Sequence, residues 1–118
     1  MDLAVISTLG ILLAVLSVPL MLGWIPRNYL YGFRVAATLR DDRTWYVVNR
    51  AFGREAIVIG LAIGLPATLA DIAGHDTAPV RYGLTAVAIA GSVWLIVRHW
   101  RGANRLARDQ ERAGGRSG

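Results

Sequence analysis

Arginine is the side chain of this sequence best suited to binding chemistry, and it is concentrated in a polar central segment and after the last apolar run. All 13 cationic side chains of the 118 residues are arginines, and six of them lie between residues 27 and 54. Arg34 follows Gly32, a residue that permits a tight bend. An arginine between a bend and a helix start can hold a phosphate or a carboxylate by two parallel hydrogen bonds. Contact with a lipid headgroup is the simpler alternative for Arg34 taken alone.

An amphipathic helix is predicted over about residues 38–52. The hydroxyl of Thr38 can cap its first turn, and the two aspartates at 41 and 42 suit the positive end of a helix dipole. Trp45, Val48 and Phe52 recur at the spacing of one helical face. We therefore expect this helix to lie at the membrane interface on its cytoplasmic side, with Trp45 as its anchor.

Asn49 is a polar residue beside Trp45 on that same face. A buried amide needs hydrogen-bond partners. Asn49 therefore either pins the helix to the extended stretch before it or to a bound partner, or it simply faces lipid headgroups.

Residues that support catalysis are scarce. His75 and His99 are the two histidines, and they fall on opposite sides of the predicted membrane. Cysteine is absent, so a thiolate nucleophile or metal ligand is excluded. The chain also lacks the HExxH, Gly-rich phosphate-loop and GxSxG patterns. We expect a protein that is not an enzyme, with no catalytic residue, metal or cofactor, and we interpret both histidines as ordinary surface residues.

A second group of arginines follows the last apolar run at intervals of 3, 4, 3 and 4 residues, which makes one helical stripe: Arg98, Arg101, Arg105, Arg108 and Arg112. Such a stripe beside a membrane attracts anionic lipid headgroups, by about 1 kcal/mol per charge. Docking to an acidic cytoplasmic protein is the alternative. The favoured interpretation is lipid.

Three apolar runs would position these groups. Hydrophobic residues make up 54% of the chain, and mean hydropathy is +0.42. No charge occurs between Leu3 and Ile25, a stretch of about 34 Å as a helix, which exceeds a hydrocarbon core of about 30 Å. We predict an all-α membrane protein with three transmembrane helices at about 3–25, 54–73 and 80–98, in one domain spanning 1–113, followed by a disordered tail at 114–118.

The second run is short between its flanking charges, Glu55 and Asp71. Either these charges snorkel toward the headgroups, or one of them lies inside the membrane boundary and faces a partner helix. Small residues four apart predict close helix packing in each span, at Gly10–Ala14, Gly60–Gly64 and Ala86–Ala90. The alternative is that glycine and alanine are simply common in such helices.

The distribution of arginine predicts the orientation. Six arginines lie between the first two spans and six follow the third, whereas the short loop before residue 82 holds Arg81 alone and the N-terminus holds none. The positive-inside rule then places the N-terminus outside and both the long loop and the C-terminus in the cytoplasm. The net charge of +5 is explained by these flanking arginines, so we expect no nucleic-acid partner.

The central segment resembles the signature of the SdpI family of small bacterial membrane proteins. The resemblance covers about residues 28–53, and it is carried by Asn28, Gly32, Arg34, Thr38, Leu39, Trp45, Asn49, Arg50 and Gly53. Phe33 lies inside the first triplet. The chain departs from the pattern at Val35 and Ala36, where relatives often have Thr and Pro.

This resemblance implies a multi-pass protein of the bacterial cytoplasmic membrane with a role in immunity to a secreted toxin and in signalling. The implied mechanism is binding. The outer surface and the spans would meet a peptide toxin, or another membrane protein that is its target, and the segment from Gly32 to Gly53 would meet a cytoplasmic protein. A structural accessory subunit of a larger membrane complex is the alternative function.

Overall fold

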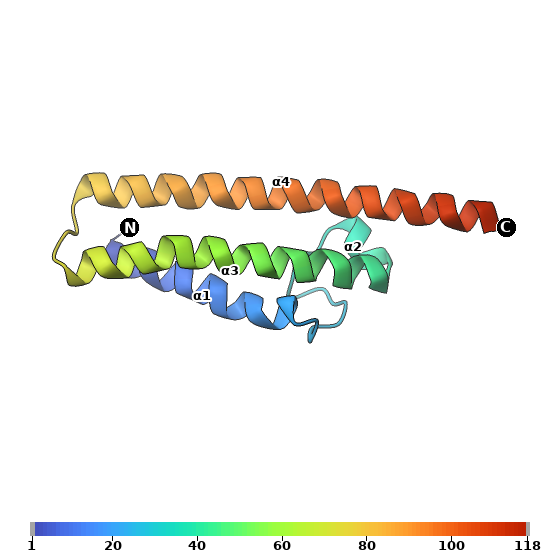
Figure 1. Cartoon of the computed structure of the whole chain (residues 1–118), viewed down its shortest axis with the longest axis horizontal. Coiled ribbons are helices and arrows are strands. Elements are labelled where there is room, and N and C mark those ends of the chain that lie inside the picture. Colours follow the sequence, from blue (N-terminus) through green and yellow to red (C-terminus); the bar gives the residue numbers. More distant parts are fainter. Residues whose placement is uncertain (1, 118) are drawn as a thin grey trace.

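The computed structural model describes residues 2–117, and the side chains of residues 2–115. Four helices make up the described chain: α1 (Leu3–Met21), α2 (Ala36–Arg40), α3 (Asp42–Ile72) and α4 (Ala78–Ser117). Figure 1 shows α1, α3 and α4 side by side along the long axis, with the short α2 near the start of α3. Three of these helices, all except α2, are long and apolar enough to cross a membrane.

α1 is a single apolar helix that begins and ends with clear signals. The carboxylate of Asp2 accepts a hydrogen bond from the backbone N–H of Val5 at 2.9 Å and so caps the first turn. The helix ends four residues before the predicted boundary at 25, and Gly23 then takes a positive φ of 73°. Its 19 residues span about 28 Å, close to the thickness of a hydrocarbon core.

Glycines let α1 and α3 approach each other closely, as predicted. A β-carbon on Gly10 would lie 2.8 Å from the carbonyl oxygen of Gly60, and one on Gly60 would lie 2.9 Å from the backbone nitrogen of Ala14. Backbone therefore packs against backbone at this crossing. The prediction for Ala86–Ala90 is wrong, because both residues are exposed on α4.

The predicted interfacial helix is not a separate element. α3 runs without interruption from Asp42 to Ile72, so residues 42–52 continue directly into the second predicted span. α2 occupies residues 36–40 and ends at Asp41, whose extended backbone separates it from α3. The structure therefore does not confirm the predicted interfacial helix at 38–52. The physical reason is that nothing between Phe52 and Ala56 breaks the helical backbone.

α4 is longer than the predicted third span and continues as helix to Ser117, past the expected domain end at 113. Residue 118 of the predicted tail lies outside the described residues. α4 packs loosely against the rest of the molecule. In the most apolar stretch of 18 residues of each helix, 6% is buried in α4, 33% in α1 and 28% in α3.

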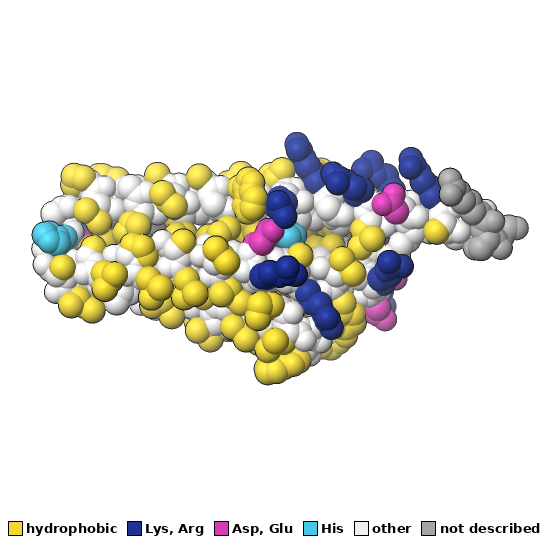
Figure 2. Space-filling view, viewed as in Figure 1, with side chains coloured by type: hydrophobic (Ala, Val, Ile, Leu, Met, Phe, Trp, Pro, Cys, Tyr) yellow, Lys and Arg dark blue, Asp and Glu magenta, His cyan; other side chains and the backbone are white. Residues whose placement is uncertain are grey.

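The molecule has two parts, because α3 and α4 extend past the end of α1. Gly53 of α3 packs beside Met21, the last residue of α1. Residues 42–52 of α3 and the last turns of α4 therefore extend beyond the end of α1. In Figure 2 arginines gather toward that end, and hydrophobic side chains cover much of the other half. We call the unit formed by residues 22–52 and residues 99–107 of α4 the head.

Candidate functional site

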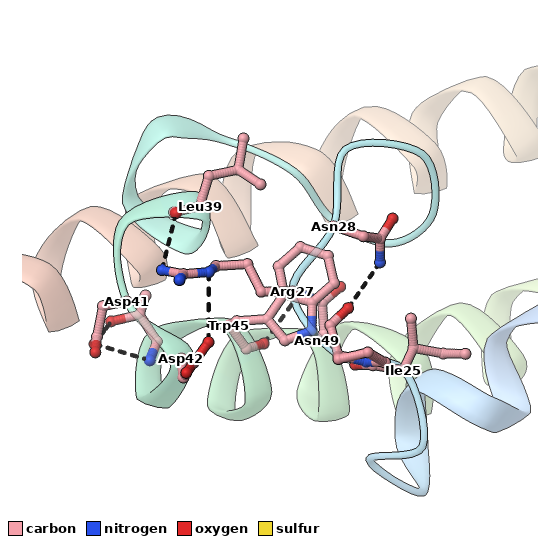
Figure 3. Close-up of polar contacts among 10 residues, drawn as sticks. Ile25, Arg27, Asn28, Leu39, Asp41, Asp42, Trp45 and Asn49 are labelled. Carbon is pink, nitrogen blue, oxygen red and sulfur yellow. Dashed lines mark hydrogen bonds and ion pairs between the residues drawn. The ribbon is translucent and has the colours of Figure 1, made fainter.

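Trp45 and Asn49 attach the loop after α1 to the side of α3 (Figure 3). The indole Nε1 of Trp45 donates to the carbonyl oxygen of Ile25 at 2.8 Å. The side-chain oxygen of Asn49 accepts from the backbone N–H of Phe33 at 2.6 Å, and its Nδ2 donates to the carbonyl oxygen of Trp45 at 3.0 Å. Trp45 is 0% exposed and Asn49 is 2% exposed. The predicted pin by Asn49 is confirmed, whereas the prediction of Trp45 as a membrane anchor is wrong, because the head encloses its ring.

Gly32 makes the bend that this attachment requires. Its φ is 114°, a region that residues with a β-carbon rarely adopt. A β-carbon there would also lie 2.9 Å from the side-chain oxygen of Asn49 and 3.0 Å from the Trp45 ring. The predicted bend is confirmed, and the spacing between Gly32, Trp45 and Asn49 in the sequence reflects their contact.

Asn28 folds the first part of the loop around its own side chain. Its Oδ1 accepts from the backbone N–H groups of Leu30 at 2.8 Å and Tyr31 at 2.7 Å. Its Nδ2 donates to the carbonyl oxygens of Pro26 at 2.7 Å and Tyr31 at 3.0 Å. One amide thus satisfies four backbone groups that a loop would otherwise turn toward water.

Thr38 stabilises α2 and not α3, contrary to the sequence prediction. Its buried hydroxyl accepts from the backbone N–H of Val35 at 2.9 Å and donates to the carbonyl oxygen of Phe33 at 2.9 Å. Asp41 caps α3 instead, by accepting from the backbone N–H and the hydroxyl of Thr44. The Thr44 hydroxyl, and then its N–H, lower the pKa of Asp41. This cap therefore stabilises α3 at neutral pH and loses its contribution as the pH falls through that pKa.

Arg27 links the loop to the junction of α2 and α3. Its Nη1 donates to the carbonyl oxygen of Leu39 at 3.2 Å, and its Nε lies 3.4 Å from the Asp42 carboxylate. Leu39 thus contributes its backbone carbonyl to the head, and no ligand contact is needed to explain its place in the motif.

Gly53 and Arg50 lie where the head meets α1. A β-carbon on Gly53 would lie 2.6 Å from the backbone nitrogen of Met21 and 2.8 Å from the carbonyl oxygen of Ser17. The guanidinium of Arg50 lies directly across Gly23, within 3 Å of the position that a β-carbon would take there. Gly53 is therefore a point of helix contact, and Arg50 places an exposed cation at the base of the loop.

A group of charged side chains that the sequence analysis did not bring together joins α3 to α4. One carboxylate oxygen of Glu55 lies 2.8 Å from Nη2 of Arg98, and the other lies 2.7 Å from Nε2 of His99. His99 is 7% exposed, and its ring also makes T-shaped contacts with the rings of Phe33 and Phe52. Glu55 faces a partner helix, α4, as one of its two alternatives held. The interpretation of His99 as a surface residue is wrong.

A sequence signal for this group did exist. Glu55 begins the second predicted span, Arg98 and His99 end the third, and the predicted topology puts both ends at one side of the membrane. Side chains at equal depth on adjacent antiparallel helices can meet, so this pattern predicts a contact between Glu55 and the pair Arg98 and His99.

Two residues of the predicted motif point outward, Arg34 and Arg50, and both are exposed. Arg34 also donates to the carbonyl oxygen of Tyr29. The other seven form bends, helix contacts and internal hydrogen bonds: Asn28, Gly32, Thr38, Leu39, Trp45, Asn49 and Gly53. Most of the motif therefore builds the head.

The arginine stripe of α4 lies opposite its buried face. Arg98, Arg101, Arg105, Arg108 and Arg112 are all exposed, whereas Ala103 is fully buried against the head. Arg98 is engaged with Glu55 and also lies over the Trp94 ring, 5.2 Å from its centroid. Within residues 2–115 the ion pairs include none at the other four arginines of the stripe.

In the described part of the chain no three histidine, aspartate or glutamate side chains lie close enough to hold a metal ion.

One family model matches this sequence, the SdpI/YfhL protein family, over residues 24–98. The match covers well over half of the chain and includes the loop, α2, α3 and the apolar part of α4. No curated protein and no solved structure matches.

Proposed function

The chain belongs to the SdpI/YfhL protein family and is a multi-pass membrane protein of that family, and from this we propose a non-enzymatic binding function in toxin immunity or signalling. The observation that supports it best is the division of labour among the motif residues. Seven of them fix the fold of the head, and exposed arginines remain on its outside and along α4. A rigid scaffold that presents cations suits recognition of a partner.

We place the head in the cytoplasm and the N-terminus outside the cell. Eleven of the twelve arginines with described side chains lie at the head end, and Arg81, paired with Asp76, lies at the other. The positive-inside rule favours this orientation in the bacterial cytoplasmic membrane.

The straight course of α4 supports two different partners for its arginine stripe. Arg98 lies beside Glu55, near the level at which α1 ends, but Arg112 is fourteen residues further along the helix, about 21 Å away. The field of an anionic lipid surface decays over a Debye length of about 8 Å. Arg98 and Arg101 therefore suit lipid headgroups, and we assign Arg105, Arg108 and Arg112 to an acidic surface of a cytoplasmic protein.

Expression of the chain in a bacterium that is sensitive to a membrane-active peptide toxin is expected to raise survival above that of cells with an empty vector. The triple variant Arg105→Gln, Arg108→Gln and Arg112→Gln is expected to lose this gain, because it removes the charges assigned to the partner. Survival after toxin exposure is the measurement, with the amount of protein in the membrane fraction determined in parallel.

Arg43→Gln is the matched control, since it removes one exposed arginine from the first turn of α3 and leaves α4 unchanged. It is expected to retain the gain. Equal survival with and without the chain, for every toxin tested and at normal protein levels, would refute the immunity proposal.

A structural accessory subunit is the second candidate, and the loose packing of α4 favours it. Val87, Ile89 and Val93 are each more than half exposed on that helix. Purification in a mild detergent with a large partner in fixed stoichiometry would support this function in place of immunity.

A further inference from the structure

The loop between α1 and α2 exposes an unusual amount of apolar surface. Leu30 is 89% exposed, Tyr29 is 78% exposed and Trp24 is 69% exposed. Loops that face water rarely present three large apolar side chains within seven residues. We propose that residues 22–31 form an interfacial wedge, which inserts its side chains among the lipids of the leaflet that borders the head.

The level of the loop supports a lipid environment. Trp24 lies three residues after the end of α1, a helix whose length already matches the hydrocarbon core. Figure 1 shows the loop just past the end of α1, on the side of the bundle away from α4. This position corresponds to the headgroup layer, where tryptophan and tyrosine are enriched in membrane proteins.

The polar backbone groups of the wedge are hydrogen-bonded within the loop, which suits a poorly hydrated layer. Asn28 satisfies the N–H groups of Leu30 and Tyr31 and the carbonyls of Pro26 and Tyr31. An unsatisfied backbone group in a lipid environment costs several kcal/mol, as an order of magnitude. A loop whose polar groups are bonded internally avoids much of that cost.

The wedge is also held in a fixed position. The Trp45 indole holds the carbonyl of Ile25, and the Arg34 guanidinium holds the carbonyl of Tyr29. The side chains at the tip are therefore presented in one direction by a folded head, and a helix of the kind predicted at 38–52 is not needed to anchor the head to the membrane.

Lipid is a better occupant than a protein because the apolar surface is continuous with that of α1. Leu16 is 47% exposed on the helix and Leu22 is 43% exposed at its end, so the lipid-facing side of α1 leads into the loop. Arg50 places its cation across Gly23 at the base of the wedge, where it can pair with a lipid phosphate.

The chain contains no cysteine, so single labels can be placed without background. Leu30→Cys carrying a nitroxide, reconstituted in vesicles of phosphatidylcholine and phosphatidylglycerol, would be compared by its accessibility to oxygen and to a water-soluble nickel chelate. Two reference variants bracket the depth scale. Ile89→Cys lies on the exposed apolar part of α4, and Arg108→Cys lies nine residues beyond His99.

The label at residue 30 is expected to have an oxygen-to-nickel accessibility ratio several-fold above that of the label at 108 and below that of the label at 89. A ratio equal to that at 108 would overturn the wedge, because the loop would then lie in water. Low accessibility to both reagents would also overturn it, since a protein surface would then cover the tip. Tyr29→Cys, at a second exposed position, repeats the test, and neither result depends on whether the chain confers immunity.

Discussion

Replacing Trp45 with alanine is expected to reduce the free energy of unfolding of the head by about 3–5 kcal/mol, the usual cost of removing a buried aromatic ring. The ring is 0% exposed and lies against Gly32 in the loop, and its indole N–H holds the carbonyl of Ile25. Truncation would leave a cavity between α3 and the loop. It would also release the segment that links α1 to α2.

Native-state proteolysis by trypsin in mild detergent measures this loss, because Arg40 and Arg43 lie at the junction of α2 and α3, and we expect cleavage there to accelerate when the head opens. The stated loss corresponds to an acceleration of cleavage by about two to four orders of magnitude. Trp45→Phe should fall between wild type and alanine, since it keeps a ring and loses the hydrogen bond. Trp100→Ala is the matched control at a half-exposed site. Equal cleavage rates for the two alanine variants would contradict the burial of Trp45.

Gly60→Ala is expected to destabilise the α1–α3 pair by about 1–3 kcal/mol, the range for overpacking. In an exposed helix the same substitution stabilises by about 1 kcal/mol. Here the added methyl carbon would lie 2.5 Å from the carbonyl oxygen of Gly10, and backbone cannot move aside as a flexible side chain can. The sign of the effect is therefore reversed by the helix contact.

Gly83→Ala is the matched control, since a β-carbon at residue 83 of α4 would meet no atom within 4 Å. Loss of helicity during titration with sodium dodecyl sulfate gives the relative stabilities of the two variants. Gly60→Ala should lose helicity at lower detergent fractions than wild type, and Gly83→Ala should not. A Gly60→Ala protein as stable as the Gly83→Ala protein would show that the two backbones are not in contact.

Local patterns predicted the helices of this protein well. The uncharged runs gave three spans, and glycines four residues apart correctly indicated the contact at Gly60. Each of these signals is contained in a few consecutive residues, and lipid leaves a long apolar run few alternatives to a helix.

Long-range contacts account for what local patterns missed. Trp45 has the amphipathic spacing of an interfacial anchor. Its burial depends on the loop around Ile25, 20 residues earlier in the sequence, whose carbonyl accepts the indole N–H. His99 looked isolated because Glu55 is 44 residues away in sequence. Gly53 has the appearance of a helix end, whereas it marks the place where α1 packs against an unbroken helix.

Most residues of the motif stabilise the fold of the head. Its glycines permit a bend and a close helix contact, and its amide, hydroxyl and indole groups take up the polar backbone of the loop. Function then depends on what the folded head presents, and loss of a motif residue would affect binding through the fold.

Amide hydrogen exchange at Phe33 tests this account most directly. The N–H of Phe33 is bonded to the side chain of Asn49, 16 residues away, so it reports whether the loop is attached to α3. In the wild-type protein in lipid nanodiscs we predict slow exchange at Phe33, fast exchange in Asn49→Ala, and slow exchange in Arg43→Ala, which removes an exposed side chain of α3. Exchange in the wild type as fast as in an unstructured peptide would contradict the central claim that the motif folds a fixed head.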